Sequence, residues 1–100
     1  MARMKFRITF APEARGDYLS IPAYERAAVR DAINAHLLQN PARVSKSWIK
    51  RVRDVKTPQY RLRVGEVRVF YDVRGSEVEV LGIVEKRHAA QWLAGRTERS

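Results

Sequence analysis

The feature that most constrains the fold is a pair of alternating segments on either side of the dipeptide Gly65-Glu66. Before it, the residues from 59 to 64 place Tyr60, Leu62 and Val64 on one side. After it, the residues from 67 to 73 alternate in the same way. A Gly in so short a connection supplies the positive φ that a tight turn needs. Because successive side chains of a strand point to opposite faces, the pattern predicts an antiparallel hairpin.

Two further segments extend this hairpin into a sheet. Alternation from Met4 to Phe10 predicts a first strand with an apolar side and a polar side. The residues from 78 to 84 predict a strand that follows the hairpin through Arg74-Gly75-Ser76, which again contains a Gly. The last three strands are therefore expected to form an antiparallel meander.

Three segments carry helical signals. A short helix is expected to begin at Pro12 and run towards Tyr18, because Pro is favoured at the first helical position. A longer helix follows Ser20-Ile21-Pro22, with apolar residues at helical spacing up to Asn40-Pro41. A third, from 85 to 94, is rich in helix-forming residues and is stopped by Gly95.

The order of these elements, βααβββα, predicts one α+β domain over residues 1–100, with helices packed on one face of an antiparallel sheet. A chain of 100 residues, of which 45% are hydrophobic, has material for a single modest core. The basic segment from 42 to 58 is interpreted as an ordered loop with some turn of helix. The second face of the sheet is expected to be free.

Charge limits the partners of such a domain. Twenty Lys and Arg against 11 Asp and Glu give a net charge of +9. A positive field of this strength favours a polyanion, which is nucleic acid, an anionic membrane surface or an acidic protein. Without Cys and with only two distant His, we expect no disulfide, metal or cofactor. A signal peptide and a membrane-spanning run are both lacking, so we expect a cytoplasmic protein that enters no membrane.

Several of the cations fall on the predicted free face. Arg61 and Arg63 alternate with the apolar set of the first hairpin strand, and the short turn places Arg68 beside them around Phe70. This arrangement suits RNA, because Arg binds phosphate through paired hydrogen bonds and stabilises charge that develops on phosphorus. The alternative is a solvated outer face, which is the commoner situation for any single arginine.

The run Glu85-Lys86-Arg87-His88 adds more cations and an imidazole at the end of the last strand. His88 is a candidate acid or base, because His titrates near neutral pH. The alternative is a surface residue whose charged form is disfavoured by the neighbouring cations. His36 is in register with the apolar positions of the long helix and is expected to pack there. Trp48 and Trp92 are expected to be core or interface anchors rather than base-stacking platforms.

The run from Tyr60 to Val73, YRLRVGEVRVFYDV, resembles the central hairpin of RelE/ParE superfamily toxins of type II toxin-antitoxin systems. The order of elements, the Asn40-Pro41 end of the long helix and the basic pair after the last strand are similar too. The resemblance implies a RelE/ParE-like fold and a toxin that a cognate antitoxin neutralises through an acidic or amphipathic segment.

Toxins of this superfamily fall into two branches. RelE-like toxins cleave mRNA on the ribosome, and the resemblance implies that Arg61, Arg63 and Arg68 hold phosphate there. In the same way Arg87 is expected to stabilise the transition state, with His88 as the provisional proton-transfer group. Members of this branch often carry a Tyr or His in the C-terminal segment, where this chain has Trp92-Leu93.

ParE-like toxins share the fold, inhibit DNA gyrase and need no catalytic residues, so the missing Tyr favours them somewhat. A degenerate member that binds antitoxin without toxicity is a third possibility. We prefer the RelE-like interpretation, a metal-independent mRNA endonuclease that inhibits translation.

Overall fold

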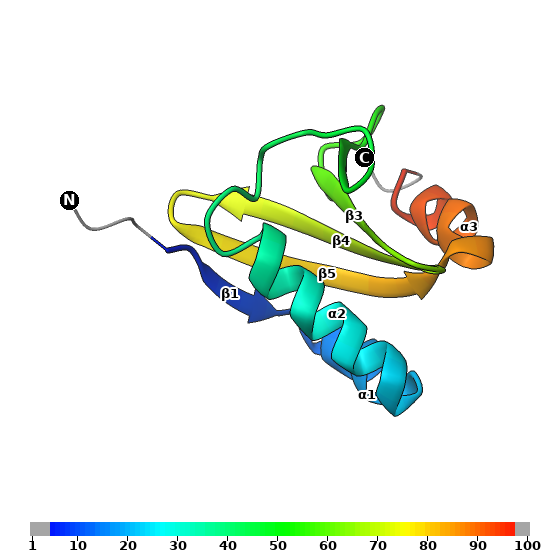
Figure 1. The fold of residues 1–100 in the computed structure, drawn as a ribbon. Coiled ribbons are helices and arrows are strands. Elements are labelled where there is room, and N and C mark those ends of the chain that lie inside the picture. Colours follow the sequence, from blue (N-terminus) through cyan, green and yellow to red (C-terminus); the bar gives the residue numbers. More distant parts are fainter. Residues whose placement is uncertain (1–4, 98–100) are drawn as a thin grey trace.

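The computed structural model describes residues 5–97 (Figure 1). Along the chain the elements are β1 (Arg7–Phe10), α1 (Pro12–Ser20), α2 (Ala23–His36), β2 (Ile49–Arg51), β3 (Tyr60–Val64), β4 (Val67–Arg74), β5 (Glu77–Glu85) and α3 (Lys86–Thr97). The α+β class expected from the sequence is confirmed. The first strand is shorter than expected, and Met4 lies outside the described residues.

The five strands form one sheet in the order β1-β5-β4-β3-β2. Strands β2 to β5 are antiparallel neighbours, as the meander predicted. Strand β1 instead pairs in parallel with β5, from Arg7 opposite Glu77 to Phe10 opposite Val80, so the sheet is mixed rather than antiparallel. Parallel pairing needs a long crossover between the two strands, and the helices and strands between them provide it. Alternation within one segment carries no information on this direction.

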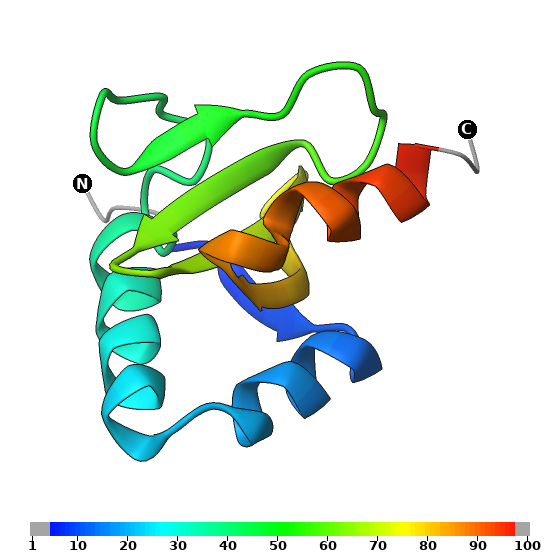
Figure 2. The ribbon, with the colours of Figure 1, turned by 90° about the vertical axis from the view of Figure 1, so that its right-hand side faces the viewer.

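One face of the sheet packs against α1 and α2 (Figures 1 and 2). The predicted hairpin register is confirmed, with Gly65 at a φ of 57° in the turn and Tyr60 opposite Tyr71. The apolar side of the hairpin meets the apolar face of α2, which is the outcome that both periodicities predict. The buried cluster includes Ala14, Val29, Ile33, Leu37, Leu62, Val69, Tyr71, Val78 and Val80.

The opposite face is covered in part by α3, so the expectation that all helices share one face is wrong. Trp92 of α3 stacks on Phe70 of β4 with ring centroids 4.7 Å apart. Phe70 lies opposite Gly82 of β5, and this glycine leaves the space that the indole fills. The sequence interpretation of Trp92 as a packing anchor is confirmed. The site where Trp92 packs is formed by residues of two strands, so the sequence of one segment alone does not predict it.

The segment between α2 and β3 contains the short edge strand β2 in place of the expected turn of helix. The carboxylate of Asp72, which is 1% exposed, accepts hydrogen bonds from the Thr57 hydroxyl (2.6 Å) and the Gln59 backbone N–H (2.7 Å). The half-buried His36 stacks on Trp48 at 4.8 Å between ring centroids, which confirms its packing role. These contacts order the segment, as expected.

Candidate nucleic-acid interface

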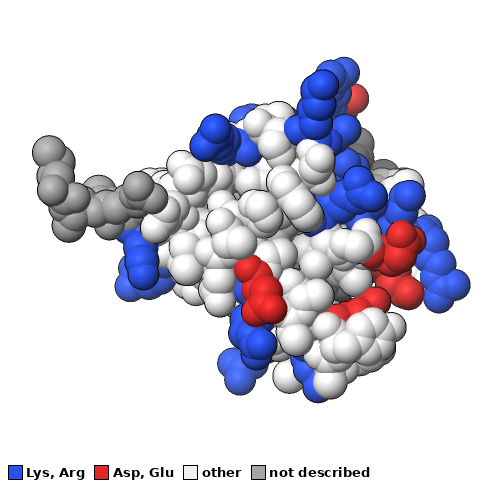
Figure 3. Space-filling view, in the orientation of Figure 1, with Lys and Arg blue, Asp and Glu red and all other residues white. Residues whose placement is uncertain are grey.

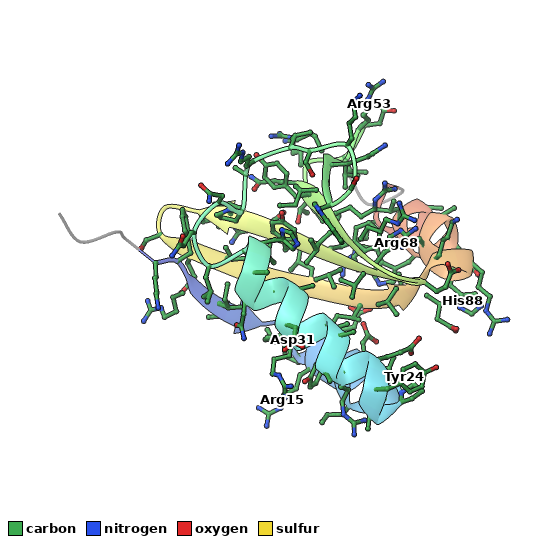
Figure 4. The ribbon with its side chains drawn as sticks, in the orientation of Figure 1. Arg15, Tyr24, Asp31, Arg53, Arg68 and His88 are labelled. Carbon is green, nitrogen blue, oxygen red and sulfur yellow. The ribbon has the colours of Figure 1, made fainter. Side chains whose placement is uncertain are left out.

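Strands β3 and β4 bring three of the predicted site residues together on the α3 side of the sheet. One of them, Arg68, is labelled in Figure 4. Arg63 lies directly opposite Arg68, and Arg61 lies opposite Phe70. We call Arg61, Arg63 and Arg68 the arginine face. Their shared face follows from strand alternation and from the turn at Gly65, which sets the register of the hairpin. The sequence predicted this grouping correctly.

Arg68 differs from the other two because it is buried, with 6% of its surface exposed. Its Nη1 donates hydrogen bonds to the carbonyl oxygens of Gly65 (2.8 Å) and Val67 (3.0 Å). Burial lowers the pKa of the Arg68 guanidinium below its usual value, and the nearby charges of Arg61 and Arg63 lower that pKa further. Arg68 therefore holds the turn and adds positive potential to the face, while an incoming phosphate has better access to its neighbours.

Arg61 and Arg63 have no acidic partner within the described residues. Arg63 is exposed, whereas Arg61 is half-buried, and its buried Nε atom has no hydrogen-bond partner among residues 5–97. A buried donor without a partner is uncommon and costs free energy. Arg61, Phe70, Leu93 and residues 50–53 line a small hollow beside α3, which we call the α3-side hollow. An anion held there would face the positive charge of Arg61.

The other two predicted site residues, Arg87 and His88, stand in the first turn of α3. Arg87 Nη2 lies 3.4 Å from an Oε1 oxygen of Glu85, and His88 Nδ1 lies 3.7 Å from the same oxygen. His88 lines a different groove from Arg61, one whose walls include Asp17, Glu25 and Tyr24 of the two N-terminal helices (Figure 4). The structure does not bring this pair into the α3-side hollow.

A basic residue that the sequence interpretation left out of the site belongs beside these arginines. Lys50 of β2 lies directly opposite Arg61, so its side chain shares the face. The signal was the density of Lys and Arg between 42 and 58, but a strand of three residues is too short for alternation to show which of them point towards the arginines. Figure 3 shows Lys and Arg gathered over this loop and towards α3.

Metal-binding clusters and membrane-spanning helices are both absent from residues 5–97. No three His, Cys, Asp or Glu side chains among residues 5–97 are grouped so that they would hold a metal ion. None of the helices in that part of the chain has the length and apolar character needed to cross a membrane.

Comparison with solved structures identifies the fold. No protein family and no curated protein matches the sequence. Among solved structures, a chain of the toxin-antitoxin complex RelBE2 from Mycobacterium tuberculosis superposes with a TM-score of 0.70 at 24% identity, covering 82% of this chain and 99% of that one. A mutant of the Escherichia coli toxin RelE in the free state gives a TM-score of 0.70 at 16% identity, covering 96% and 97%. The chain has the RelE toxin fold.

The RelE fold is also shared by YoeB from Staphylococcus aureus, with a TM-score of 0.60 at 21% identity over 83% of this chain and 97% of YoeB. The match with RelE extends over nearly the whole chain, so the fold includes the sheet, the N-terminal helices and α3. The RelE/ParE-like fold expected from the hairpin sequence is therefore confirmed.

Proposed function

We propose that the chain is the toxin of a type II toxin-antitoxin system and that it cleaves mRNA on the ribosome. The observation that supports this most directly is the arginine face on the hairpin of a RelE fold, whose three guanidinium groups form no ion pair within residues 5–97. A phosphodiester satisfies such a face, because it supplies negative charge and several acceptor oxygens. The site of action would be the cytoplasm, where the ribosome is.

In the proposed reaction the message lies across the arginine face. Arg61 and Arg63 bind the phosphate, and Arg68 contributes charge from behind them. The ribose 2′-hydroxyl gives its proton to a base while its oxygen bonds to the adjacent phosphorus. The bond from phosphorus to the 5′-oxygen breaks, and the leaving oxygen takes up a proton, which leaves a 2′,3′-cyclic phosphate and a 5′-hydroxyl. The face stabilises the extra negative charge on the phosphoryl oxygens in the transition state. This chemistry needs neither a metal nor a cofactor.

Arg87 and His88 remain proposed site residues. Arg87 would stabilise the transition state, and His88 would transfer the proton, because the only other imidazole, His36, is stacked on Trp48. The separate groove of His88 makes this part of the proposal the easiest to test. With His88→Ala the cleavage rate should fall by about 10²-fold or more if the imidazole acts as acid or base, while binding of the message persists.

The proposed partner besides mRNA is a cognate antitoxin. Solved structures with this fold include toxin-antitoxin complexes from Mycobacterium tuberculosis and Pyrococcus horikoshii. The net charge of +9 suits an acidic segment on that partner. An acidic segment over the arginine face would block RNA by occupying the same charges.

A second candidate function is inhibition of DNA gyrase without catalysis. It is favoured by the placement of His88 and Arg61 in different grooves and by the stacking of Trp92 on Phe70, in the segment where RelE-like toxins often carry a Tyr or His. On this alternative toxicity needs no catalysis by the arginine face, and Arg61→Gln together with Arg63→Gln leaves toxicity intact. A degenerate member that only binds antitoxin is the third candidate.

The experiment that separates the candidates is induction of the chain in a bacterial host. Incorporation of labelled methionine and thymidine is followed after induction, with primer extension on an abundant mRNA. Rapid loss of methionine incorporation with ribosome-dependent cuts inside codons supports the endonuclease. Early loss of thymidine incorporation with intact mRNA supports gyrase inhibition, and an effect on neither supports the degenerate member. A double substitution of Lys5 and Arg15 to Gln is the charge-matched control for the arginine face.

A further inference from the structure

A second basic concavity lies along the outer edge of β2. It is lined by Val44, Ser45, Lys46, Lys50, Arg51 and Arg53, and we call it the edge hollow. Four of its six lining residues are cations and none is acidic. Cations gathered in this way raise the local positive potential, which favours an anionic ligand.

The charges of the edge hollow are not neutralised by the described part of the chain. Nine Lys and Arg lie between residues 43 and 68, and none of them forms an ion pair within residues 5–97. The paired cations lie elsewhere, as in Arg7 with Glu77 and Arg96 with Glu13. Unneutralised charge is therefore concentrated on β2, β3 and their loops.

Backbone and side-chain hydrogen bonds give the edge hollow a defined shape. The Ser45 hydroxyl accepts from the backbone N–H of Trp48 (3.0 Å) and of Ile49 (3.3 Å), and the Ser45 N–H donates to the Ile49 carbonyl (2.9 Å). Arg51 stacks on the Tyr60 ring, with its guanidinium carbon 5.2 Å from the ring centroid. A pre-ordered cation such as Arg51 loses less entropy on binding than a free one does.

The edge hollow adjoins the α3-side hollow. Lys50, Arg51 and Arg53 line both, and Lys50 is the cross-strand neighbour of Arg61. Trp48 comes just before β2 in the chain, its carbonyl accepts the Arg63 backbone N–H (2.8 Å), and it is 47% exposed. One side of its ring is covered by His36. A basic path with an adjacent exposed aromatic ring is the pattern of single-stranded nucleic-acid binding sites.

We propose that an RNA strand held on the arginine face continues over β2 into the edge hollow, where Lys46, Lys50 and Arg53 bind the phosphates of flanking nucleotides. Trp48 offers its uncovered face to one of their bases. This inference rests on the proposed function in taking RNA as the ligand of the arginine face. An acidic peptide fits less well, because Val44 is the only apolar side chain of the edge hollow and peptide recognition uses apolar pockets.

The test measures how affinity grows with RNA length. Fluorescently labelled single-stranded RNA with 2′-O-methyl groups, which cannot be cut, is titrated with the full chain in a series of lengths. The longer strands should bind more tightly than the shortest one. With Lys46→Gln, which we call the edge variant because Lys46 lines the edge hollow and not the α3-side hollow, the shortest RNA keeps its affinity and the longest loses part of its gain. The slope of log affinity against log salt for long RNA falls by about 0.7 for the one lost contact.

The matched control carries Lys5→Gln, which removes the same charge from an exposed residue near β1. Far-ultraviolet circular dichroism checks that both variants are folded. The inference is wrong if short and long RNA weaken equally in the edge variant, or if the control loses as much affinity for long RNA. It is also wrong if the edge variant binds RNA as tightly as the wild type does but binds polyglutamate more weakly, because the ligand of the edge hollow is then an acidic protein.

Failure of the proposed function gives a different pattern. If the chain does not cut mRNA, induction leaves primer-extension products intact, while length-dependent binding to the edge hollow persists. If only the further inference fails, cleavage proceeds and the edge variant binds every length of RNA as the wild type does.

Discussion

Replacing Gly82 by Ala tests whether one aromatic contact holds α3 on the sheet. A Cβ atom at this position would lie 2.3 Å from Cζ2 of Trp92 and 2.7 Å from its Cε2, far inside van der Waals contact. The indole is fixed between Phe70, at 4.7 Å between centroids, and the Arg96 guanidinium, 4.1 Å from the ring centroid. Overpacking of this kind costs 1–3 kcal/mol, and a stacked aromatic pair contributes about 1 kcal/mol beyond its buried area. We expect Gly82→Ala to lower the free energy of unfolding by about 2 kcal/mol.

The assay is a double-mutant cycle measured by urea unfolding and far-ultraviolet circular dichroism, with Trp92→Ala as the second substitution. Without the indole, Ala at position 82 meets no obstacle, and it stabilises by about 0.5 kcal/mol because it restricts the unfolded chain. The two substitutions should therefore be strongly non-additive, with an interaction energy of about 2 kcal/mol or more. An equal cost of Gly82→Ala in both backgrounds would refute the reasoning, because Trp92 would not be the obstacle.

Three other changes have defined outcomes. Tyr71→Phe removes the hydrogen bond from the buried phenol to the Pro41 carbonyl and should cost about 1–2 kcal/mol in urea unfolding. Burial raises the pKa of Asp17, so the free energy of unfolding falls as the pH rises from the pKa of this carboxyl in the unfolded chain to its pKa in the folded chain. Asp17→Asn should flatten the profile of urea unfolding midpoints over this pH interval, and an unchanged slope would contradict the expectation. Arg63→Gln removes a like charge directly opposite Arg68 and should stabilise by about 0.5 kcal/mol at low salt, with no gain at high salt.

The hairpin was predictable because everything that determines it is local. Alternation fixes the faces, and the short connection with Gly65 at positive φ fixes the register, so Arg61, Arg63 and Arg68 had to share a side. The long helix was predictable for the same reason, since its apolar spacing repeats over many residues. The helix ends earlier than predicted, because α2 stops at His36 with Leu37 as its C-cap, and the residues from there to Asn40 are not helical.

The features that sequence reasoning missed depend on contacts between distant segments. The direction of β1 is decided by its pairing with β5, and β2 is recognisable only beside β3. The packing site of Trp92 forms only when Phe70 and Gly82 lie opposite each other on neighbouring strands. The position of His88 follows from where α3 leaves the sheet, which local sequence does not specify. For that reason the strand part of the candidate site was predicted better than the helical part.

The arginine face has an energetic consequence for its partners. Arg63 opposite Arg68 is unfavourable in the free chain, and the unpartnered Nε of Arg61 adds to the cost. A ligand that binds only the folded state stabilises it by RT ln(1 + [L]/Kd), and here the ligand also relieves this repulsion. Under the proposed function, RNA and an acidic antitoxin segment would gain from the same relief and would compete for one surface. Neutralisation by an antitoxin would then require no change in the fold, only a higher occupancy of the arginine face than the message reaches.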